Sequence, residues 1–502
     1  MTDLLIATVP FTYTFGPSLS PALLKACTTN KGIDSQAWDL SADFNHRYSS
    51  HEFYDSVVTW LQNAEMTLTE QEFDWYTELV KGYAAQIKNT SLTVALSLLT
   101  QNSQRFAEDL AFHIKLLDSD IKIIIGGNGI DILQHQYQKK WHELMLNSGL
   151  VDLVILGEGE FALADAILKN ASGVITVPQL TNRELGLVPV PDYSDYNFDL
   201  YPKSKKTFWS VNRDQRQEND TIFLITASKG CVKNCNFCDV GKIWSRFRFR
   251  SGESVANEMI ELNEKYGATY FSFTDSLLNG GLKPFFDLNQ ALVNRLPKKI
   301  KYEGQMICRS EKDMPEKYFK AMATAGCFYV SIGLESGSES VRMHMGKGSS
   351  QEDIYYTTQM LIKYNIKQSW NIIAGYIIET DEDWQQTMNL IKHWLPIANG
   401  LLLINPIDTF MLLDGTPMSD MLDELQIFTH VVNGYHSFAW TSNLNPTNTY
   451  TVRANRFIEL CEYLILFDLT TYGHLQNRID NTKKKLSWYK DDTKKVYSLS
   501  QY

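Results

Sequence analysis

Three cysteines in the segment GCVKNCNFCDVG have the side chains and the spacing to hold an inorganic cofactor. Cys231, Cys235 and Cys238 are separated by three and by two residues, so their thiolates can turn toward one point on a single loop. Iron–sulfur clusters are held by cysteine thiolates, and a cluster of four irons usually takes four. No fourth cysteine is close in sequence, which would leave one iron open to a small ligand. The alternative is zinc, but a structural zinc site needs four nitrogen or sulfur ligands, and no neighbouring His or Cys completes that set.

This segment resembles the radical S-adenosylmethionine (SAM) superfamily. It has the spacing CxxxCxxC, and an aromatic residue, Phe237, precedes the third cysteine. The resemblance implies a [4Fe–4S] cluster on the three cysteines, with the amino and carboxylate groups of SAM on the open iron. The reduced cluster cleaves SAM to a 5′-deoxyadenosyl radical, which abstracts hydrogen from an unactivated carbon. An electron donor such as flavodoxin or ferredoxin is the implied partner.

Two further positions resemble SAM contacts of this superfamily. Asp275 and Ser276 follow the predicted strand Tyr270–Phe273, where the family places its contact with the SAM amino group, although the usual Gly-Gly-Glu is missing. A helix N-cap is the alternative interpretation. Arg309 follows the predicted strand Lys301–Met306, at a position that contacts the SAM carboxylate or ribose. A guanidinium suits a carboxylate, and an ordinary surface arginine is the alternative.

Two strings later in the chain also resemble the family. In GLESGSE, Glu335 occupies the position that binds the ribose hydroxyls of SAM, and Lys347 follows where a basic residue meets the carboxylate. A purely structural role for Glu335 is the alternative. In IIAGYIIETDED, Gly375 would let the adenine approach the backbone closely. The proline usual in that string is absent.

The first part of the chain resembles the cobalamin-binding domain that precedes the radical SAM barrel in one subgroup. Apolar runs at Leu4–Val9, Leu92–Leu99, Ile121–Ile125 and Val151–Leu156 alternate with helical patterns, which predicts a doubly wound parallel sheet. Ligands of such sheets bind at the carboxyl ends of the strands. No DxHxxG string is present, so the resemblance implies base-off cobalamin; a purely structural flavodoxin-like domain is the alternative. The predicted cobalamin contacts are Pro10, Ser97, Gly126, Gly127, Gly157, Glu158 and Gly159.

The pattern of elements predicts an α/β protein with four parts. Residues 1–180 form the cobalamin-binding-like domain, and residues 181–206, which contain three prolines, form a linker. Residues 207–404 alternate strand and helix again and predict a partial (β/α) barrel. Residues 405–502 form an α-rich C-terminal extension that we expect to select the substrate.

Composition and charge argue against several classes of protein, namely nucleic-acid-binding, membrane and secreted proteins. The 502 residues carry a net charge of −11, which does not favour a nucleic-acid partner. We see no apolar run of about 20 residues, so no membrane helix is expected. The sparse cysteines argue against a secreted disulfide scaffold, and the cytoplasm is the expected compartment. Cys27, Cys308, Cys327 and Cys461 are expected to be buried apolar residues.

Together these features predict an enzyme that uses the cluster, SAM and cobalamin to methylate an unactivated carbon. Two alternatives stay open. One is a radical cyclisation or rearrangement with the same cofactors and no methyl transfer. The other is a non-catalytic iron–sulfur protein for binding or redox sensing. The substrate, a small molecule or a peptide, is not specified by the sequence.

Overall fold

A computed structural model describes the chain except for residues 12–15, 64–65, 131–139, 202–221, 296–299, 414, 430–437, 468–474 and 500–502, and the side chains of 490–499. The described chain divides into two compact units. The first consists of Met1–Lys203, Asp220–Ile225 and Glu258–Ala268, and the second contains Thr226–Asn257 and Thr269–Tyr502. The predicted start of the barrel at residue 207 lies outside the described residues.

The first unit contains a six-stranded, fully parallel sheet in the order β2-β1-β3-β4-β5-β6. The order reverses between β1 and β3, the arrangement of flavodoxin-like sheets, and ligands of such sheets bind at this reversal. The doubly wound prediction is therefore confirmed. The strands are β1 (Leu4–Thr8), β2 (Ser35–Trp38), β3 (Thr93–Ser97), β4 (Lys122–Gly126), β5 (Leu153–Leu156) and β6 (Gly173–Thr176).

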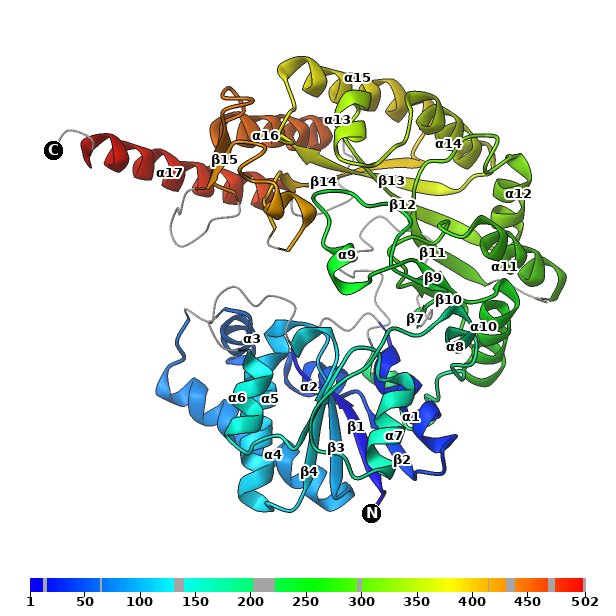
Figure 1. Ribbon diagram of the computed structural model, residues 1–502, viewed down its shortest axis with the longest axis vertical. Coiled ribbons are helices and arrows are strands. Elements are labelled where there is room, and N and C mark those ends of the chain that lie inside the picture. The colour runs from blue at the N-terminus through cyan, green and yellow to red at the C-terminus, as the bar shows by residue number, and fades with distance from the viewer. Residues whose placement is uncertain are drawn as a thin grey trace. The chain divides into compact units, whose positions relative to one another are not determined.

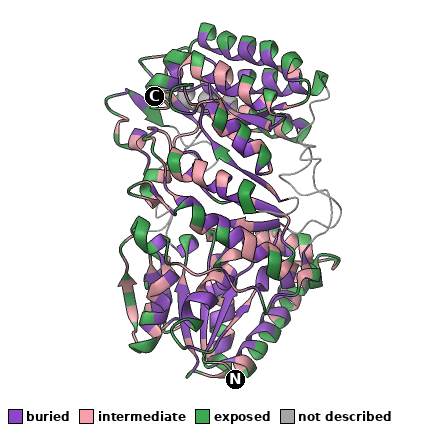
Figure 2. Ribbon diagram, turned by 90° about the vertical axis from the view of Figure 1, so that its right-hand side faces the viewer, coloured by how far each residue is buried: buried purple, intermediate pink, exposed green. Residues whose placement is uncertain are grey.

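Helices cover both faces of this sheet (Figure 1). The larger buried cluster joins β1, β3 and β4 to α4 (Glu70–Thr90) and α5 (Gln104–Leu117), through Val80, Ile87 and Leu110. A smaller cluster on the opposite face includes Ile6 and Leu163, with α1 (Leu19–Thr29) and α7 (Gly159–Leu168) nearby. The remaining helices are α2 (Leu40–Tyr48), α3 (Tyr54–Gln62), α6 (Trp141–Asn147) and α8 (Asn182–Leu185). Figure 2 shows buried strands between half-buried helices.

The segment predicted to be a linker packs closely on the first unit. Lys25 is 6% exposed, and its ammonium group contacts the carboxylates of Asp192 at 3.1 Å and Asp195 at 2.7 Å. Asp39 is 3% exposed and accepts a hydrogen bond from the hydroxyl of Tyr201 at 2.8 Å. The residues after 190 thus complete the buried polar contacts of the first unit, up to the last described residue before the gap at 202.

We expect Asp39→Asn to destabilise the first unit by about 2–4 kcal/mol. Its carboxylate also accepts from the Thr8 hydroxyl and from the amides of Ser18 and Ala42, so a carboxamide would turn an N–H₂ group toward buried donors. The midpoint of urea unfolding, followed by far-UV circular dichroism, measures the loss. Asp55→Asn on exposed α3 is the control and should change stability by less than about 0.5 kcal/mol. Equal midpoints for the two variants would contradict the prediction.

The second sheet has six strands in the order β14-β13-β12-β11-β10-β7. Every pairing from β10 to β14 is parallel, and α10–α15 lie along one face (Figure 1). This open sheet confirms the partial-barrel prediction. The strands are β7 (Ile222–Ile225), β10 (Tyr270–Phe273), β11 (Lys301–Met306), β12 (Cys327–Glu335), β13 (Lys367–Ala374) and β14 (Leu402–Thr409), and the helices are α10 (Gly252–Tyr266), α11 (Leu282–Arg295), α12 (Glu316–Thr324), α13 (Glu339–His344), α14 (Gln351–Lys363) and α15 (Asp381–Ala398).

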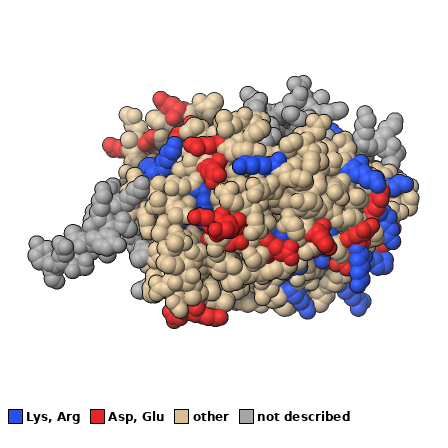
Figure 3. All heavy atoms as spheres, turned by 90° about the horizontal axis from the view of Figure 1, so that it is seen from above, with Lys and Arg blue, Asp and Glu red and all other residues tan. Residues whose placement is uncertain are grey.

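The C-terminal part is mainly helical, as predicted. Its long helices are α16 (Tyr450–Leu466) and α17 (Leu475–Leu499), and a short 3₁₀ turn, η4 (Pro417–Asp420), and a two-stranded ribbon of β15 (Ile427–Thr429) and β16 (Trp440–Ser442) precede them. On the face drawn in Figure 3, acidic and basic side chains are interspersed among uncharged residues. Among the described helices, none has the length and apolar character to cross a membrane.

Candidate functional site

The three predicted cluster cysteines lie on the loop between β8 (Ser228–Lys229) and the short helix α9 (Val240–Ile243). The pKa of the Cys235 thiol is raised to about 11, mainly by burial; Lys347 opposes this shift, while Cys238 and Cys231 add to it. The pKa of Cys238 is also raised, chiefly by burial. The three cysteines share one eight-residue segment, and Lys347 Nζ lies 5.7 Å from the centre of the ring of Phe237 in that segment.

The donor set of this loop fits an iron–sulfur cluster. Within the described ranges, no three His, Cys, Asp or Glu side chains converge on a single metal ion. A four-iron cluster takes each thiolate on a different iron, so its ligands stand further apart. A Cβ added to Gly346 would lie 3.4 Å from Cys235 Cα and 3.0 Å from the Asn234 carbonyl oxygen, so the glycine allows close packing behind the cysteines. If a cluster binds, Cys231, Cys235 and Cys238 would hold it.

Asp275 braces the chain segment that leads into the cysteine loop. It is 1% exposed, and its carboxylate accepts from the Ala227 amide at 3.0 Å and from the Ser228 hydroxyl at 2.5 Å. Burial raises the pKa of Asp275 to about 6. The Asp275 carboxylate thus links the end of β10 to β8. A SAM contact at Asp275 or at the half-buried Ser276 stays a prediction.

Arg309 lies three residues beyond β11 and is half-buried. One of its terminal nitrogens donates to the carbonyl of Asn279 at 3.0 Å. Its pKa is lowered by burial, and Cys231 acts on it in the opposite direction, so the guanidinium lies near the cysteine loop. Arg309 Nε is buried and has no protein partner. The structure therefore makes Arg309 available to the site as predicted, although its role toward SAM stays a prediction.

Glu335 and Lys347 form an ion pair at the carboxyl end of β12. Lys347 Nζ lies 2.8 Å from Glu335 Oε1 and also donates to the Gly333 carbonyl at 2.9 Å. Glu335 has φ = 66°, an unusual backbone angle for a residue other than glycine. Lys347 Nζ is also 5.7 Å from the centre of the Phe237 ring, and the contacts of Glu335 and Lys347 with SAM stay a prediction. The pair thus lies next to the cysteine loop.

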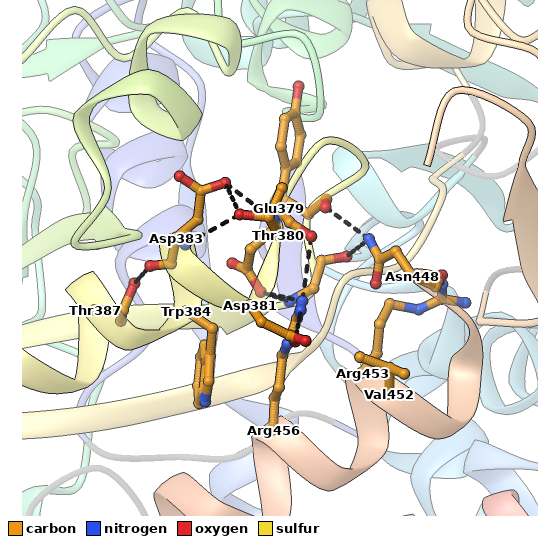
Figure 4. Close-up of polar contacts among 12 residues, drawn as sticks. Glu379, Thr380, Asp381, Asp383, Trp384, Thr387, Asn448, Val452, Arg453 and Arg456 are labelled. Atoms are coloured by element: carbon orange, nitrogen blue, oxygen red, sulfur yellow. Dashed lines mark hydrogen bonds and ion pairs between the residues drawn. The ribbon is translucent and has the colours of Figure 1, made fainter. Parts of the chain in front are cut away.

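The structure gives a reason for a glycine at position 375 that differs from the predicted approach of adenine. Its φ is 79°, and an added Cβ would collide with the side chain of Arg453 on α16. The space above this glycine is therefore filled by the protein rather than left for adenine. Figure 4 shows Asn448 and Arg453 in the same region as Glu379. An adenine contact at Gly375 would have to use its other side and stays a prediction.

The predicted cobalamin residues lie at the carboxyl ends of neighbouring strands. Pro10 follows β1, Ser97 ends β3 and Gly126 ends β4; the Ser97 hydroxyl lies 2.7 Å from that of Ser20 on α1. Side chains at Gly127 and Gly157 would collide with the carbonyls of Leu98 and Val177, so packing within the chain already requires these glycines. Glu158 accepts from the Leu180 amide, and Gly159 begins α7. The location is as predicted, and contact with cobalamin is not tested.

One face of the second sheet carries polar side chains that sequence analysis did not identify. Ser331 and Ser369 are adjacent across β12 and β13, and Asn405 Nδ2 donates to Asn371 Oδ1 at 2.9 Å. Gln305 on β11, paired with Ser331, is exposed. Strands buried on both faces are usually apolar throughout, so this polar face, which also carries Glu303 on β11, is suited to a hydrogen-bonding ligand. The period-two alternation of polar residues was the available signal.

Comparison with known proteins agrees with this geometry. Residues 225–391 match the Radical SAM superfamily model. The chain contains a radical SAM domain. Such a domain implies a [4Fe–4S] cluster and SAM, and it encloses the cysteine loop, Asp275, Arg309, Glu335 and Lys347.

Known proteins are similar to this chain both in sequence and in fold. The chain is 26% identical over 315 residues to an uncharacterized methyltransferase of Pyrococcus horikoshii, covering 58% of this chain and 62% of that protein. In fold it resembles the cobalamin- and [4Fe–4S]-bound methyltransferase TsrM of Kitasatospora setae (TM-score 0.57, 14% identity, 86% of this chain and 78% of TsrM). It also resembles OxsB, a cobalamin-dependent SAM radical enzyme (TM-score 0.61, 13% identity, 92% and 67%). The alignment with the Pyrococcus horikoshii protein thus covers less than two thirds of the length of that relative.

Proposed function

We propose that this protein is a cobalamin-dependent radical SAM methyltransferase that methylates an unactivated carbon. The observation that carries the proposal is the three-cysteine loop beside the Glu335–Lys347 pair, in one chain with a sheet of order β2-β1-β3-β4-β5-β6. The fold of both units resembles TsrM and OxsB, which bind cobalamin. The name of the Pyrococcus relative favours methyl transfer.

In this proposal each group of residues has a defined task. The cluster, when bound, supplies the electron that cleaves SAM to a 5′-deoxyadenosyl radical. Lys347 and Arg309 offer positive charge to the SAM carboxylate, and Glu335 offers an acceptor to the ribose. The edge of the first sheet at Pro10 and Ser97 would take base-off cobalamin. The polar face around Asn371 and Asn405 would hold a hydrogen-bonding part of the substrate, and an external flavodoxin or ferredoxin would supply electrons.

The first test is cofactor content under strict anaerobiosis. Protein reconstituted with iron and sulfide and mixed with hydroxocobalamin is desalted, and we expect about four irons per chain and one base-off cobalamin, identified by its visible spectrum. A cluster without retained cobalamin would contradict methylation through cobalamin and leave a plain radical SAM enzyme.

The second test concerns the reaction. After reduction with dithionite, we expect 5′-deoxyadenosine from SAM together with transfer of the deuterated methyl group of labelled SAM to cobalamin. Production of 5′-deoxyadenosine without any methyl transfer would favour a cyclisation or rearrangement. Absence of SAM cleavage in cluster-loaded protein would favour the non-catalytic alternative.

A further inference from the structure

Asn236, between the second and third cysteines, is held by hydrogen bonds at every polar group. Its amide donates to the Met345 carbonyl at 3.1 Å, and its carbonyl accepts from the Met418 amide at 2.8 Å. In the side chain, Nδ2 donates to the His344 carbonyl at 2.9 Å, and Oδ1 accepts from the hydroxyl of Tyr376 at 3.0 Å. No cluster role requires an asparagine here, so these four bonds need another explanation.

The side-chain bonds form a closed ring with a fixed direction. Because Asn236 Nδ2 donates, its Oδ1 must accept, and the single hydroxyl proton of Tyr376 fills that position. Tyr376 Oη lies 2.9 Å from His344 Nδ1, and it accepts from that nitrogen in the tautomer that carries the proton on Nδ1; the hydroxyl also lies 3.5 Å from the His344 carbonyl oxygen. The ring therefore runs from His344 to Tyr376 to Asn236 and back to the His344 carbonyl. Tyr376 is buried, Asn236 is half-buried and His344 is exposed, so the ring connects the surface of the cysteine loop to the core.

Tyr376 connects this ring to the end of β13. It is fully buried and directly follows Gly375, the predicted adenine position. Its ring packs against Phe410 at a centroid distance of 5.0 Å, and Phe410 also contacts Phe237, at 6.4 Å. The hydroxyl of Tyr376 thus ties the cysteine loop to the strand end that faces SAM, and its ring rests on the same aromatic residue as Phe237.

The C-terminal extension contacts the backbone of Tyr376. Asn448 Nδ2 donates to the Tyr376 carbonyl at 2.8 Å and to the Gly375 carbonyl at 3.3 Å. Met418, which contacts Asn236, also belongs to the extension. The extension therefore reaches the cysteine loop by two routes, one through the backbone at Met418 and one through Tyr376.

We propose that Asn236, Tyr376 and His344 are positioning residues that fix the cysteine loop against the SAM-facing end of β13. This deepens the proposed function, since it concerns the same site. None of the three side chains is assigned to the cluster or to SAM. Loss of the ring would leave the hydroxyl of buried Tyr376 and the side-chain amide of half-buried Asn236 without these partners, and the loop would be free to move relative to β13.

The first experiment uses the iron-free chain and does not depend on the proposed function. Hydrogen exchange of the peptide covering 231–243 is measured for wild type, Tyr376→Phe, Asn236→Ala and the double variant. Tyr376→Phe removes only the hydroxyl, and we expect exchange about tenfold faster, from the loss of one net hydrogen bond. The double variant should exchange no faster than Asn236→Ala, since both changes break one ring. Unchanged exchange in Tyr376→Phe, or additive effects, would overturn the proposal.

The second experiment separates positioning from simple stability. Tyr376→Phe is reconstituted with iron, and the electron paramagnetic resonance of the reduced cluster is titrated with SAM. We expect normal iron content and a SAM concentration for half-maximal spectral change about tenfold higher. The matched control is Tyr356→Phe, whose hydroxyl donates to the Met314 carbonyl elsewhere in the sheet domain; its exchange and titration should match wild type. A wild-type SAM titration in Tyr376→Phe would overturn the positioning role even if exchange is faster.

Discussion

Cys235→Ala is expected to abolish iron binding, from about four irons per chain to none after anaerobic reconstitution and desalting. Cys235 is the most buried of the three thiols, and it interacts electrostatically with the other two. Two remaining thiolates cannot hold a cluster that already has one ligand fewer than usual. Iron and sulfide assays together with the absorbance near 400 nm measure the loss.

The control for this change is Cys27→Ala. Cys27 is equally a free, buried cysteine, but it lies on α1 of the first unit. Its replacement should leave iron content unaltered. Iron retained at wild-type level in Cys235→Ala would show that the cluster, and with it the radical SAM chemistry, lies elsewhere.

Arg456→Met is expected to destabilise the second unit by about 3–5 kcal/mol at pH 8. Arg456 is the buried counter-ion of Glu379, which is fully buried, with Arg456 NH1 2.9 Å from Glu379 Oε1 and NH2 2.7 Å from Asp381; Figure 4 shows the three side chains together. Removing one partner leaves a buried carboxylate uncompensated. Chemical unfolding of wild type and variant measures the difference.

The pH dependence of this effect identifies its cause. Burial raises the pKa of Glu379 to about 7, although Arg456 opposes the shift. Between pH 4.5 and about 7 the folded chain keeps a proton that the unfolded chain has released, so the contribution of Glu379 to stability falls as the pH rises. The cost of Arg456→Met should therefore be smaller at pH 5.5 than at pH 8. The double variant Arg456→Met/Glu379→Gln should recover most of the loss at pH 8, and a loss independent of pH would contradict a buried charge.

Much of the fold followed from apolar runs in the sequence. The runs at Leu92–Leu99 and Ile121–Ile125 correspond to β3 and β4, because strands buried on both faces are continuously apolar. The strands β2 and β6 were missed, since both are four residues long and neither is a continuous buried run. Local sequence carries little signal for such short edge strands.

The site was predicted where the motif is local and missed where it is not. The cysteine loop is contained in eight residues, and its spacing alone indicates the chemistry. The partners of Asn236 lie 108 and 140 positions away, so no spacing rule could pair them. Gly375 was predicted to contact adenine, which stays a prediction; the side chain that lies against it is Arg453 from α16, a contact that depends on tertiary packing.

The packing of Asp192, Asp195 and Tyr201 onto the first unit has a consequence for how this chain can be divided. A fragment that ended at residue 180 would keep all six strands of the first sheet, yet it would leave the ammonium group of Lys25 and the carboxylate of Asp39 without these buried partners. The boundary of the first unit therefore does not coincide with the end of its sheet. A gene fusion that keeps these contacts must extend at least to Tyr201.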